Sequence, residues 1–153
     1  MYVVMDSDTV WEIPTVKSTI YTKYIKRLLD IIISGVAILL LSPVFLAIVI
    51  LELIYHGKPV IYKSKRPGKD GVLFDLLKFR SMTNERDENG KLLPATDRVT
   101  PFGRILRRYS LDELAGLFCI FTGKMSIIGP RPLLVEYLPL YNKRHKYRHS
   151  VKP

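Results

Sequence analysis

An uncharged apolar run from Ile31 to Leu51 limits what this chain can fold into more than any other stretch. It holds 21 residues, and as one straight helix it would be ~31 Å long, enough to cross a bilayer. Ser42-Pro43 lies at its middle. Pro43 removes the N–H that would bond the Leu39 carbonyl, which predicts a marked bend, and the Ser42 hydroxyl is placed to donate to a carbonyl freed in this way.

Basic residues stand on both sides of this run. They are Lys23, Lys26 and Arg27 before it and Lys58, Lys63, Lys65 and Arg66 after it. Because basic residues favour the cytoplasmic side of a membrane, both ends are expected on one face, as in a re-entrant helix–break–helix hairpin that enters one leaflet. A kinked helix that crosses the membrane once explains the charges and the kink about equally well. A buried core helix explains them less well, because a small domain cannot cover it on all sides.

The chain as a whole is strongly basic. The 24 Lys and Arg against 14 Asp and Glu leave a formal net charge of +10 in 153 residues, which suits nucleic acid, an anionic membrane surface or a phosphorylated substrate as partner. The lone Cys119 excludes an internal disulfide framework and a cysteine zinc site, and its apolar neighbours predict a buried thiol. His56, His145 and His149 lack a metal-binding motif, and the sequence shows no phosphate-cradling Gly-rich loop and no nucleic-acid-binding motif.

The distribution of charged and apolar residues predicts three parts. Residues 1–22 are an irregular leader, residues 23–56 form the hairpin, and residues 57–153 form a small cytoplasmic domain. In that domain we expect a strand at 60–62, a basic loop at 65–71, a strand at 72–82, an irregular segment at 92–100, and a basic amphipathic helix at 102–108 that can lie along anionic headgroups. The expected fold class is α+β, mostly helical, with amphipathic interfacial helices and a short strand pair.

A further helix is expected to begin at Ser110-Leu111-Asp112-Glu113 and to run to about Thr122, where Gly123 closes it. Ser followed by Glu three residues later is a capping box. Asp112 would then lie in the first turn, where ionised carboxylates and phosphates are both favoured. Asp112 and Glu113 are either good first-turn residues only or functional carboxylates, and the tetrapeptide alone favours the first interpretation.

Four cations are candidates for binding phosphate. Lys78 and Arg80 share a face at the end of the second expected strand, either as a solvated strand end or as a diphosphate clamp. Arg107 lies on the basic amphipathic helix. Arg131 stands in Gly129-Pro130-Arg131-Pro132, which is either an ordinary turn or a stiff loop that presents a guanidinium to phosphate with little loss of entropy.

The order of the motifs resembles a known family, the monotopic phosphoglycosyl transferases or bacterial sugar transferases. The matching pieces, in order, are Lys26-Arg27-Leu28-Leu29-Asp30, Ser42-Pro43, Arg66-Pro67-Gly68, Lys78-Phe79-Arg80-Ser81-Met82, Pro101-Phe102-Gly103-Arg104, Ser110-Leu111-Asp112-Glu113-Leu114 and Met125-Ser126-Ile127-Ile128-Gly129-Pro130-Arg131-Pro132. No single piece is decisive, but the ordered set, which covers residues 23–153, is highly specific.

The resemblance implies a re-entrant membrane helix and a catalytic domain on the cytoplasmic face of the bacterial inner membrane. It implies transfer of a sugar-1-phosphate from a UDP-sugar to polyprenyl (undecaprenyl) phosphate with release of UMP, a requirement for Mg²⁺, and a place at the start of a membrane-linked glycan such as a capsule, exopolysaccharide, O-antigen or glycoprotein oligosaccharide. Asp112 matches the nucleophile that forms a covalent phosphosugar intermediate and lies near the metal. Glu113 matches its acid/base or orienting partner. The resemblance identifies neither the sugar nor the oligomeric state.

The chain also departs from the family pattern. Ala115-Gly116 replaces a Pro-Gln pair, Cys119 replaces an Asn, and Lys124 replaces an acid, which bears on metal handling. Family members continue past Pro153, so we expect a chain truncated at its C-terminus. Two alternatives to an active transferase follow. One is a truncated, non-catalytic membrane-bound relative, and the other is a membrane-anchored basic binding module.

Overall fold

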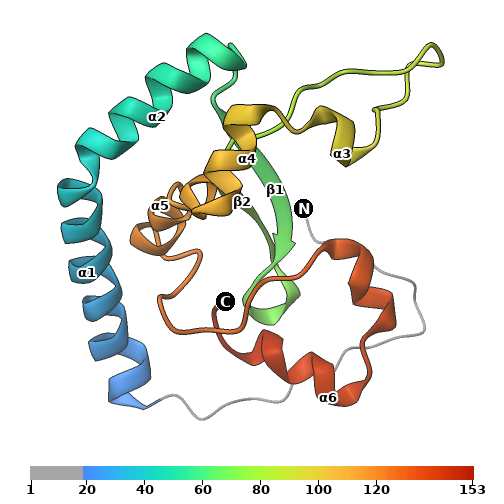
Figure 1. The fold of residues 1–153 in the computed structure, drawn as a ribbon. Helices are drawn as coiled ribbons and strands as arrows, with labels where there is room; N and C mark the ends of the chain where they lie inside the picture. Colours follow the sequence, from blue (N-terminus) through green and yellow to red (C-terminus); the bar gives the residue numbers. More distant parts are fainter. Residues whose placement is uncertain (1–18) are drawn as a thin grey trace. The chain divides into compact units, whose positions relative to one another are not determined.

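The computed structural model describes residues 19–153, so residues 1–18 of the expected leader lie outside the described part. The described chain is mostly helical with one two-stranded antiparallel sheet (Figure 1), in agreement with the expected α+β composition. The α-helices and strands, in chain order, are α1 (Lys26–Leu40), α2 (Ser42–Tyr55), β1 (Ile61–Pro67), β2 (Leu73–Phe79), α3 (Ala95–Arg98), α4 (Pro101–Arg108), α5 (Gly116–Phe121) and α6 (Lys143–Lys146). Helical structure begins at Ile20, slightly earlier than expected, with a π-helical turn at Tyr21–Ile25.

The described residues form two compact units. The first comprises residues 19–34, 65–76 and 119–153, and the second comprises residues 35–64 and 77–118. Helix α1 and the sheet therefore each contribute residues to both units. The division into leader, hairpin and cytoplasmic domain rests on membrane contact and stays a prediction.

The apolar run is broken where the sequence predicts. Helix α1 ends at Leu40 and α2 begins at Ser42, and the Ser42 hydroxyl donates to the Leu39 carbonyl at 2.8 Å. This bond confirms the expected compensation for Pro43. Among the described residues, no single helix is long and apolar enough to cross a membrane, whereas the pair 21–40 and 42–55, bent by 61° (Figure 1), meets the length and composition criteria together.

The sheet differs from the expected boundaries. Strand β1 extends to Pro67, so Lys65, Arg66 and Pro67 are strand residues rather than a loop. The reversal is confined to a 3₁₀ turn at Lys69–Gly71, closed by the Gly68 N–H bonded to the Val72 carbonyl at 2.8 Å. Cross-strand pairing outweighs the poor strand propensity of the basic and proline residues here. Strand β2 ends at Phe79, three residues before the expected end.

The core of the second unit is built by α2, β2, α4 and the segment before α5. Ile48, Phe79, Leu106 and Ala115 are buried together. The Phe45 ring lies 5.9 Å from the Phe79 ring, centre to centre. One face of α2 therefore packs on this unit.

Helix α4 is the expected amphipathic helix, and its start is capped. The Thr100 hydroxyl accepts the Gly103 N–H at 2.9 Å, and Pro101 occupies the first turn. A Cβ atom at Gly103 would collide with the Ser81 carbonyl oxygen, so glycine lets α4 approach the end of β2 closely. The segment before α4, expected to be irregular, contains the short helix α3.

The prediction of a capping box at Ser110 is wrong. Ser110 has a left-handed conformation, with φ of 55°, and its side chain makes no cap hydrogen bond. It follows the C-terminal cap of α4, Tyr109, and occupies the left-handed position that commonly ends a helix. A residue that ends one helix in this conformation does not have the extended backbone of an N-cap. The expected helix from Ser110 to Thr122 is instead a 3₁₀ turn at Leu111–Glu113 followed by the six-residue α5.

In the first unit, the start of α1 is bonded to the chain around α5. Asp30, 5% exposed, accepts the Ser126 hydroxyl and the Ile127 N–H, each at 3.1 Å. Arg27 donates to the carbonyls of Ile120 and Phe121 at 2.7 and 2.6 Å, which satisfies the end of α5. Cys119 is buried, as expected.

Candidate active site

Asp112 lies in the 3₁₀ turn between α4 and α5, in the second unit. The residue is buried, with only 8% of its surface exposed to solvent. The turn holds it there because Leu111 and Leu114, on either side, pack against the core of this unit. A single 3₁₀ turn supplies little of the macrodipole expected from a long helix, so the positive charge near Asp112 comes mainly from neighbouring side chains.

Two cations act on the carboxylate. Burial is the largest influence and raises the pKa of Asp112, while the charges of Lys78 and Arg107 lower it, and Glu113 raises it again. The direction that results is upward from the ordinary range of an aspartate. Asp112 is thus a poorly hydrated carboxylate whose proton is held more tightly than usual, beside positive charge that an incoming phosphate group can share.

Lys78 and Glu113 form an ion pair beside Asp112. The Lys78 ammonium lies 2.7 Å from a Glu113 carboxylate oxygen, with the two side chains 22% and 46% exposed. Glu113 therefore faces β2 and does not return to cap the turn. The pair orients the ammonium from the strand towards the 3₁₀ turn.

Arg107 is held by the residues that follow β2. Its Nε donates to the Ser81 hydroxyl at 3.0 Å, and one terminal nitrogen lies 3.2 Å from the Met82 sulfur. Ser81 is itself buried. The Lys-Phe-Arg-Ser-Met segment thus supplies Lys78 directly and orients Arg107 through Ser81.

Arg80 takes a different direction from Lys78. Strand β2 ends at Phe79, so strand alternation does not extend to Arg80. Its guanidinium donates to the carbonyls of Met82 and His56, at 3.0 and 3.2 Å. These bonds hold the chain at His56, before β1, and at Met82, after β2. The structure does not bring the Arg80 side chain into a clamp with Lys78.

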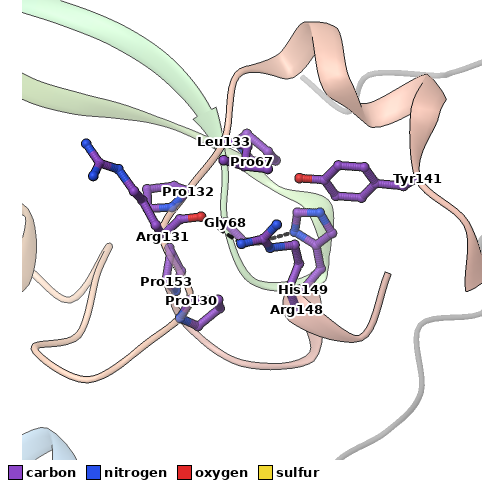
Figure 2. A pocket seen from close by; sticks show the side chains of 10 residues that line it. All are labelled: Pro67, Gly68, Pro130, Arg131, Pro132, Leu133, Tyr141, Arg148, His149 and Pro153. Atoms are coloured by element: carbon purple, nitrogen blue, oxygen red, sulfur yellow. Dashed lines mark hydrogen bonds between the residues drawn. The ribbon is translucent and has the colours of Figure 1, made fainter. Parts of the chain in front are cut away.

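Arg131 belongs to the first unit, where its loop lines a small pocket (Figure 2). The cavity has a volume of about 10 Å³ and is lined by Pro67, Gly68, Pro130, Arg131, Pro132, Leu133, Tyr141, Arg148, His149 and Pro153. The Arg131 side chain is exposed and is directed away from Tyr141 and His149. The candidates Asp112, Glu113, Lys78 and Arg107 are gathered in one unit, and Arg131 is presented by the other.

The donor set for a divalent cation is small. The described residues 19–153 contain no cluster of three or more His, Cys, Asp or Glu side chains suited to a metal ion. Mg²⁺ commonly binds one or two carboxylates together with substrate phosphates and water. A buried carboxylate at Asp112, next to Glu113, fits an ion held in this shared way and does not fit an all-protein cage.

Sequence reasoning missed a buried polar chain that joins α2 to α4. Glu52 and His56 have fully buried side chains, with 3.0 Å between a Glu52 carboxylate oxygen and His56 Nδ1. His56 Nε2 lies 2.9 Å from the Thr100 hydroxyl that caps α4. The sequence contains a signal for this pair, because an acid and a histidine four residues apart at the end of an apolar run lie on one helix face.

A bent apolar helix pair and a buried carboxylate beside two cations define a class, a protein with a bent pair of apolar helices and a carboxylate placed next to positive charge. The family model described as "Bacterial sugar transferase" matches residues 21–153. The chain belongs to this family, and the resemblance inferred from its motifs is confirmed.

Curated relatives agree with the family match. The chain is 43% identical over 129 residues to the uncharacterized sugar transferase EpsL of Bacillus subtilis, covering 84% of this chain and 64% of EpsL. It is 40% identical over 134 residues to UDP-glucose:undecaprenyl-phosphate glucose-1-phosphate transferase of Klebsiella pneumoniae, covering 84% of this chain and 29% of that protein. It is 36% identical over 141 residues to UDP-N-acetylgalactosamine-undecaprenyl-phosphate N-acetylgalactosaminephosphotransferase of Aeromonas hydrophila, covering 89% and 33%. The chain thus spans between about a third and two thirds of the length of these relatives.

Proposed function

We propose that this chain carries the catalytic site of a phosphoglycosyl transferase, which moves a sugar-1-phosphate from a UDP-sugar to polyprenyl phosphate and releases UMP. The names of the Klebsiella and Aeromonas relatives state a transfer of this kind. The observation that carries the proposal in this chain is the buried Asp112 carboxylate flanked by the charges of Lys78 and Arg107. A nucleophilic carboxylate and cations for phosphate oxygens are the parts that such a transfer needs.

The proposed reaction has two displacements at one phosphorus atom. An Asp112 oxygen attacks the sugar-bearing phosphorus of the UDP-sugar, the bond to the bridging oxygen breaks, and UMP leaves with that oxygen and its electron pair. A phosphate oxygen of polyprenyl phosphate then attacks the same phosphorus and displaces Asp112 as a free carboxylate. Splitting the transfer in this way avoids bringing two large anionic substrates together at once.

The neighbours of Asp112 have separate roles in this proposal. Lys78 and Arg107 reduce the repulsion between the carboxylate and the approaching diphosphate. Glu113 orients Lys78 through their ion pair, or serves as an acid/base group for the second displacement. Arg131 binds a diphosphate oxygen. Arg80 contributes by holding the backbone around His56 and Met82.

Mg²⁺ fits the proposal as an ion shared between Asp112 and the substrate diphosphate. When bound, it would supply positive charge to the phosphate oxygens and so favour the leaving of UMP. Lys124 is exposed and lies outside the second unit, which holds Asp112.

We further propose that the bent helix pair inserts into the cytoplasmic leaflet of the bacterial inner membrane as a re-entrant hairpin. Both helices carry large apolar side chains that are more than half exposed, a pattern that an aqueous surface does not favour. These include Leu28, Ile32, Ile33, Val36, Leu39 and Leu40 on α1 and Leu46 and Ile54 on α2. A hairpin would hold the site at the surface where a lipid phosphate can reach it.

The test is UMP release by the membrane-reconstituted protein with polyprenyl phosphate, Mg²⁺ and a panel of UDP-sugars. Asp112→Asn should lower kcat by roughly 10³-fold or more, because it removes the nucleophile. With UDP-sugar alone, the wild-type protein should gain the mass of one sugar phosphate, and D112N should not. Asp97→Asn, which removes a carboxylate from the exposed face of α3, is the matched control and should keep full activity.

Two results would overturn the proposal. Release of UMP that D112N does not reduce would exclude Asp112 as nucleophile. No UMP release with any donor would favour a non-catalytic membrane-bound relative. In that case, retention on vesicles containing anionic lipid would support membrane binding, which both the non-catalytic relative and the membrane-anchored basic binding module require.

A further inference from the structure

The loop that carries Arg131 is held through its own backbone carbonyls. Arg148 donates to the Arg131 carbonyl at 3.3 Å, and Arg66, from β1, donates to the Pro132 carbonyl at 3.4 Å. Pro130 and Pro132 restrict the loop on either side. Figure 2 shows the consequence for direction. The Arg131 carbonyl faces Arg148, while the Arg131 side chain extends to the opposite side.

Arg148 is in turn held by aromatic groups. Its guanidinium lies 6.0 Å from the centre of the Tyr141 ring, within reach of a cation–π contact. The Tyr141 ring stacks on His149, with 5.5 Å between ring centres and 21° between their planes. Arg148 is half-buried. A guanidinium confined between a ring and a backbone carbonyl has few conformations open to it.

His149 supplies a fixed, neutral support for this arrangement. It is 5% exposed, and its Nδ1 lies 3.0 Å from the Gly68 carbonyl oxygen. Because a carbonyl only accepts, Nδ1 carries the proton. Burial lowers the pKa of His149, against the opposing effect of the Gly68 bond, and the Arg148 charge lowers it further. A neutral imidazole tolerates the adjacent Arg148 guanidinium.

The chain after His149 closes the other side of the loop. The Ser126 N–H donates to the Pro153 carbonyl at 2.6 Å. A Cβ atom at Gly129 would collide with the Lys152 carbonyl oxygen. The Gly129–Pro132 loop is therefore confined between Arg66, near the end of β1, and residues 148–153, all in the first unit.

We propose that Arg148 is a positioning residue for Arg131: it fixes the Arg131 backbone so that the Arg131 guanidinium is presented to the diphosphate of the UDP-sugar in one direction. The inference rests on the proposed function, in which Arg131 binds that diphosphate. Arg148 acts through a backbone carbonyl. Its loss therefore affects binding of the nucleotide sugar and leaves binding of the lipid acceptor unchanged.

A double-mutant cycle tests this role. Arg148→Ala should raise KM for the UDP-sugar by roughly 5- to 20-fold, with KM for polyprenyl phosphate within about 2-fold of wild type. R131A should have an effect at least as large. The double variant should be no worse than R131A within about 2-fold, because a residue that acts through Arg131 has no effect once the Arg131 side chain is absent. R148K, which keeps a donor and the charge, should recover part of the loss.

Each other outcome overturns the inference. Multiplied effects in the double variant would mean that Arg148 contacts substrate independently. A lower thermal midpoint with unchanged KM would mean a structural role only, and R148K secures this comparison if R148A fails to fold. R144A removes an exposed arginine of α6 and controls for net charge. If R131A leaves KM unchanged, the proposed role of Arg131 in binding the diphosphate fails, and if the wild type is inactive, the proposed function fails. A defective R131A with a normal R148A rejects the positioning role alone.

Discussion

Asp112 combines two properties that oppose each other at the level of a single residue. Burial against the core makes the carboxylate poorly hydrated, and Lys78 and Arg107 partly restore its ionised form. Such a group is more reactive than an exposed carboxylate because less water must be removed before phosphorus approaches it. The same arrangement costs stability, because the folded protein holds a charge where a neutral group would be preferred.

This cost has a definite dependence on pH. Burial raises the pKa of Asp112 in the folded protein above that of the unfolded chain. The contribution of Asp112 to stability is therefore complete below the unfolded pKa of about 3.9 and is lost as pH rises through the raised folded pKa. Asp112→Asn, which mimics the neutral acid, should melt at a higher temperature than wild type at pH 7 to 8, and the difference should shrink towards about pH 4.

Thermal unfolding of both proteins between these pH values measures the effect. D97N serves again as the control for removing one negative charge. A D112N variant that melts below wild type at neutral pH would show that the ionised carboxylate stabilises the fold, contrary to the direction derived from burial.

At the level of a single residue, sequence reasoning found Asp112 and failed on Ser110. The pattern Ser-x-x-Glu is defined over four residues, and it does not report that α4 ends immediately before it. The ion pair of Glu113 with Lys78 was equally hidden, because the two residues are 35 positions apart. Motif order identified Asp112 as the candidate nucleophile, whereas the contacts of its neighbours depend on chain folding that a local pattern does not contain.

Among the elements, α4 has the clearest local determinants. Its eight residues, Pro101–Arg108, lie between the capping residue Thr100 and the left-handed Ser110. The Thr100 hydroxyl both caps α4 and contacts His56 Nε2, so it links α2 to the helix that carries Arg107.

Replacing this cap should be costly. Thr100→Ala removes the acceptor for the Gly103 N–H and leaves a buried His56 nitrogen without this neighbour, so it should destabilise the protein by about 2 kcal/mol, the upper end for an N-cap. Thr100→Ser keeps the hydroxyl and should restore most of the loss. Chemical denaturation with a constant m value measures the difference.

Ser110→Ala provides the matched comparison. A true capping box would make it as harmful as T100A, whereas a side chain that makes no cap bond predicts a change within about 0.5 kcal/mol. An equal loss of stability in S110A and T100A would show that Ser110 does form a capping box.

The sheet shows where composition misleads. Pro67, Gly68, Asp70 and Gly71 are typical turn residues, and they predict a loop across the whole segment. Only residues 68–72, which include the 3₁₀ turn at 69–71, leave the strand pair, because pairing with β2 holds residues 65–67 extended. Turn residues located the reversal to within a few positions and did not define its length.

For the whole molecule, the apolar run and its flanking charges predict orientation. Lysine or arginine flanks both ends of the bent helix pair, and the pair is bent by 61° at Leu41, as the proposed hairpin requires. Sequence reasoning predicted the break because proline geometry and the Ser42 bond are local effects. The division into two units joins residues far apart in the chain, and local periodicity does not report it.

A labelling experiment checks the orientation. In a Cys119→Ala background, single cysteines at Lys23 and Lys58 should both react with a membrane-impermeant maleimide in inverted vesicles and not in right-side-out vesicles. Reaction from opposite sides would establish a helix that crosses once. Pro43→Ala restores the missing N–H and permits a straight helix of about 30 Å or more, so in this variant part of the Lys58 label should move to the other side.

The contact between Gly103 and Ser81 has an evolutionary consequence. The α4 backbone rests directly on the Ser81 carbonyl oxygen, so a single methyl group at position 103 displaces the helix that carries Arg107. In a library of random variants selected for the proposed transferase activity, the exposed positions 104 and 105 should accept many amino acids, and position 103 should retain glycine alone. A lineage that loses this glycine loses the orientation of the site while every charged residue is still in its sequence.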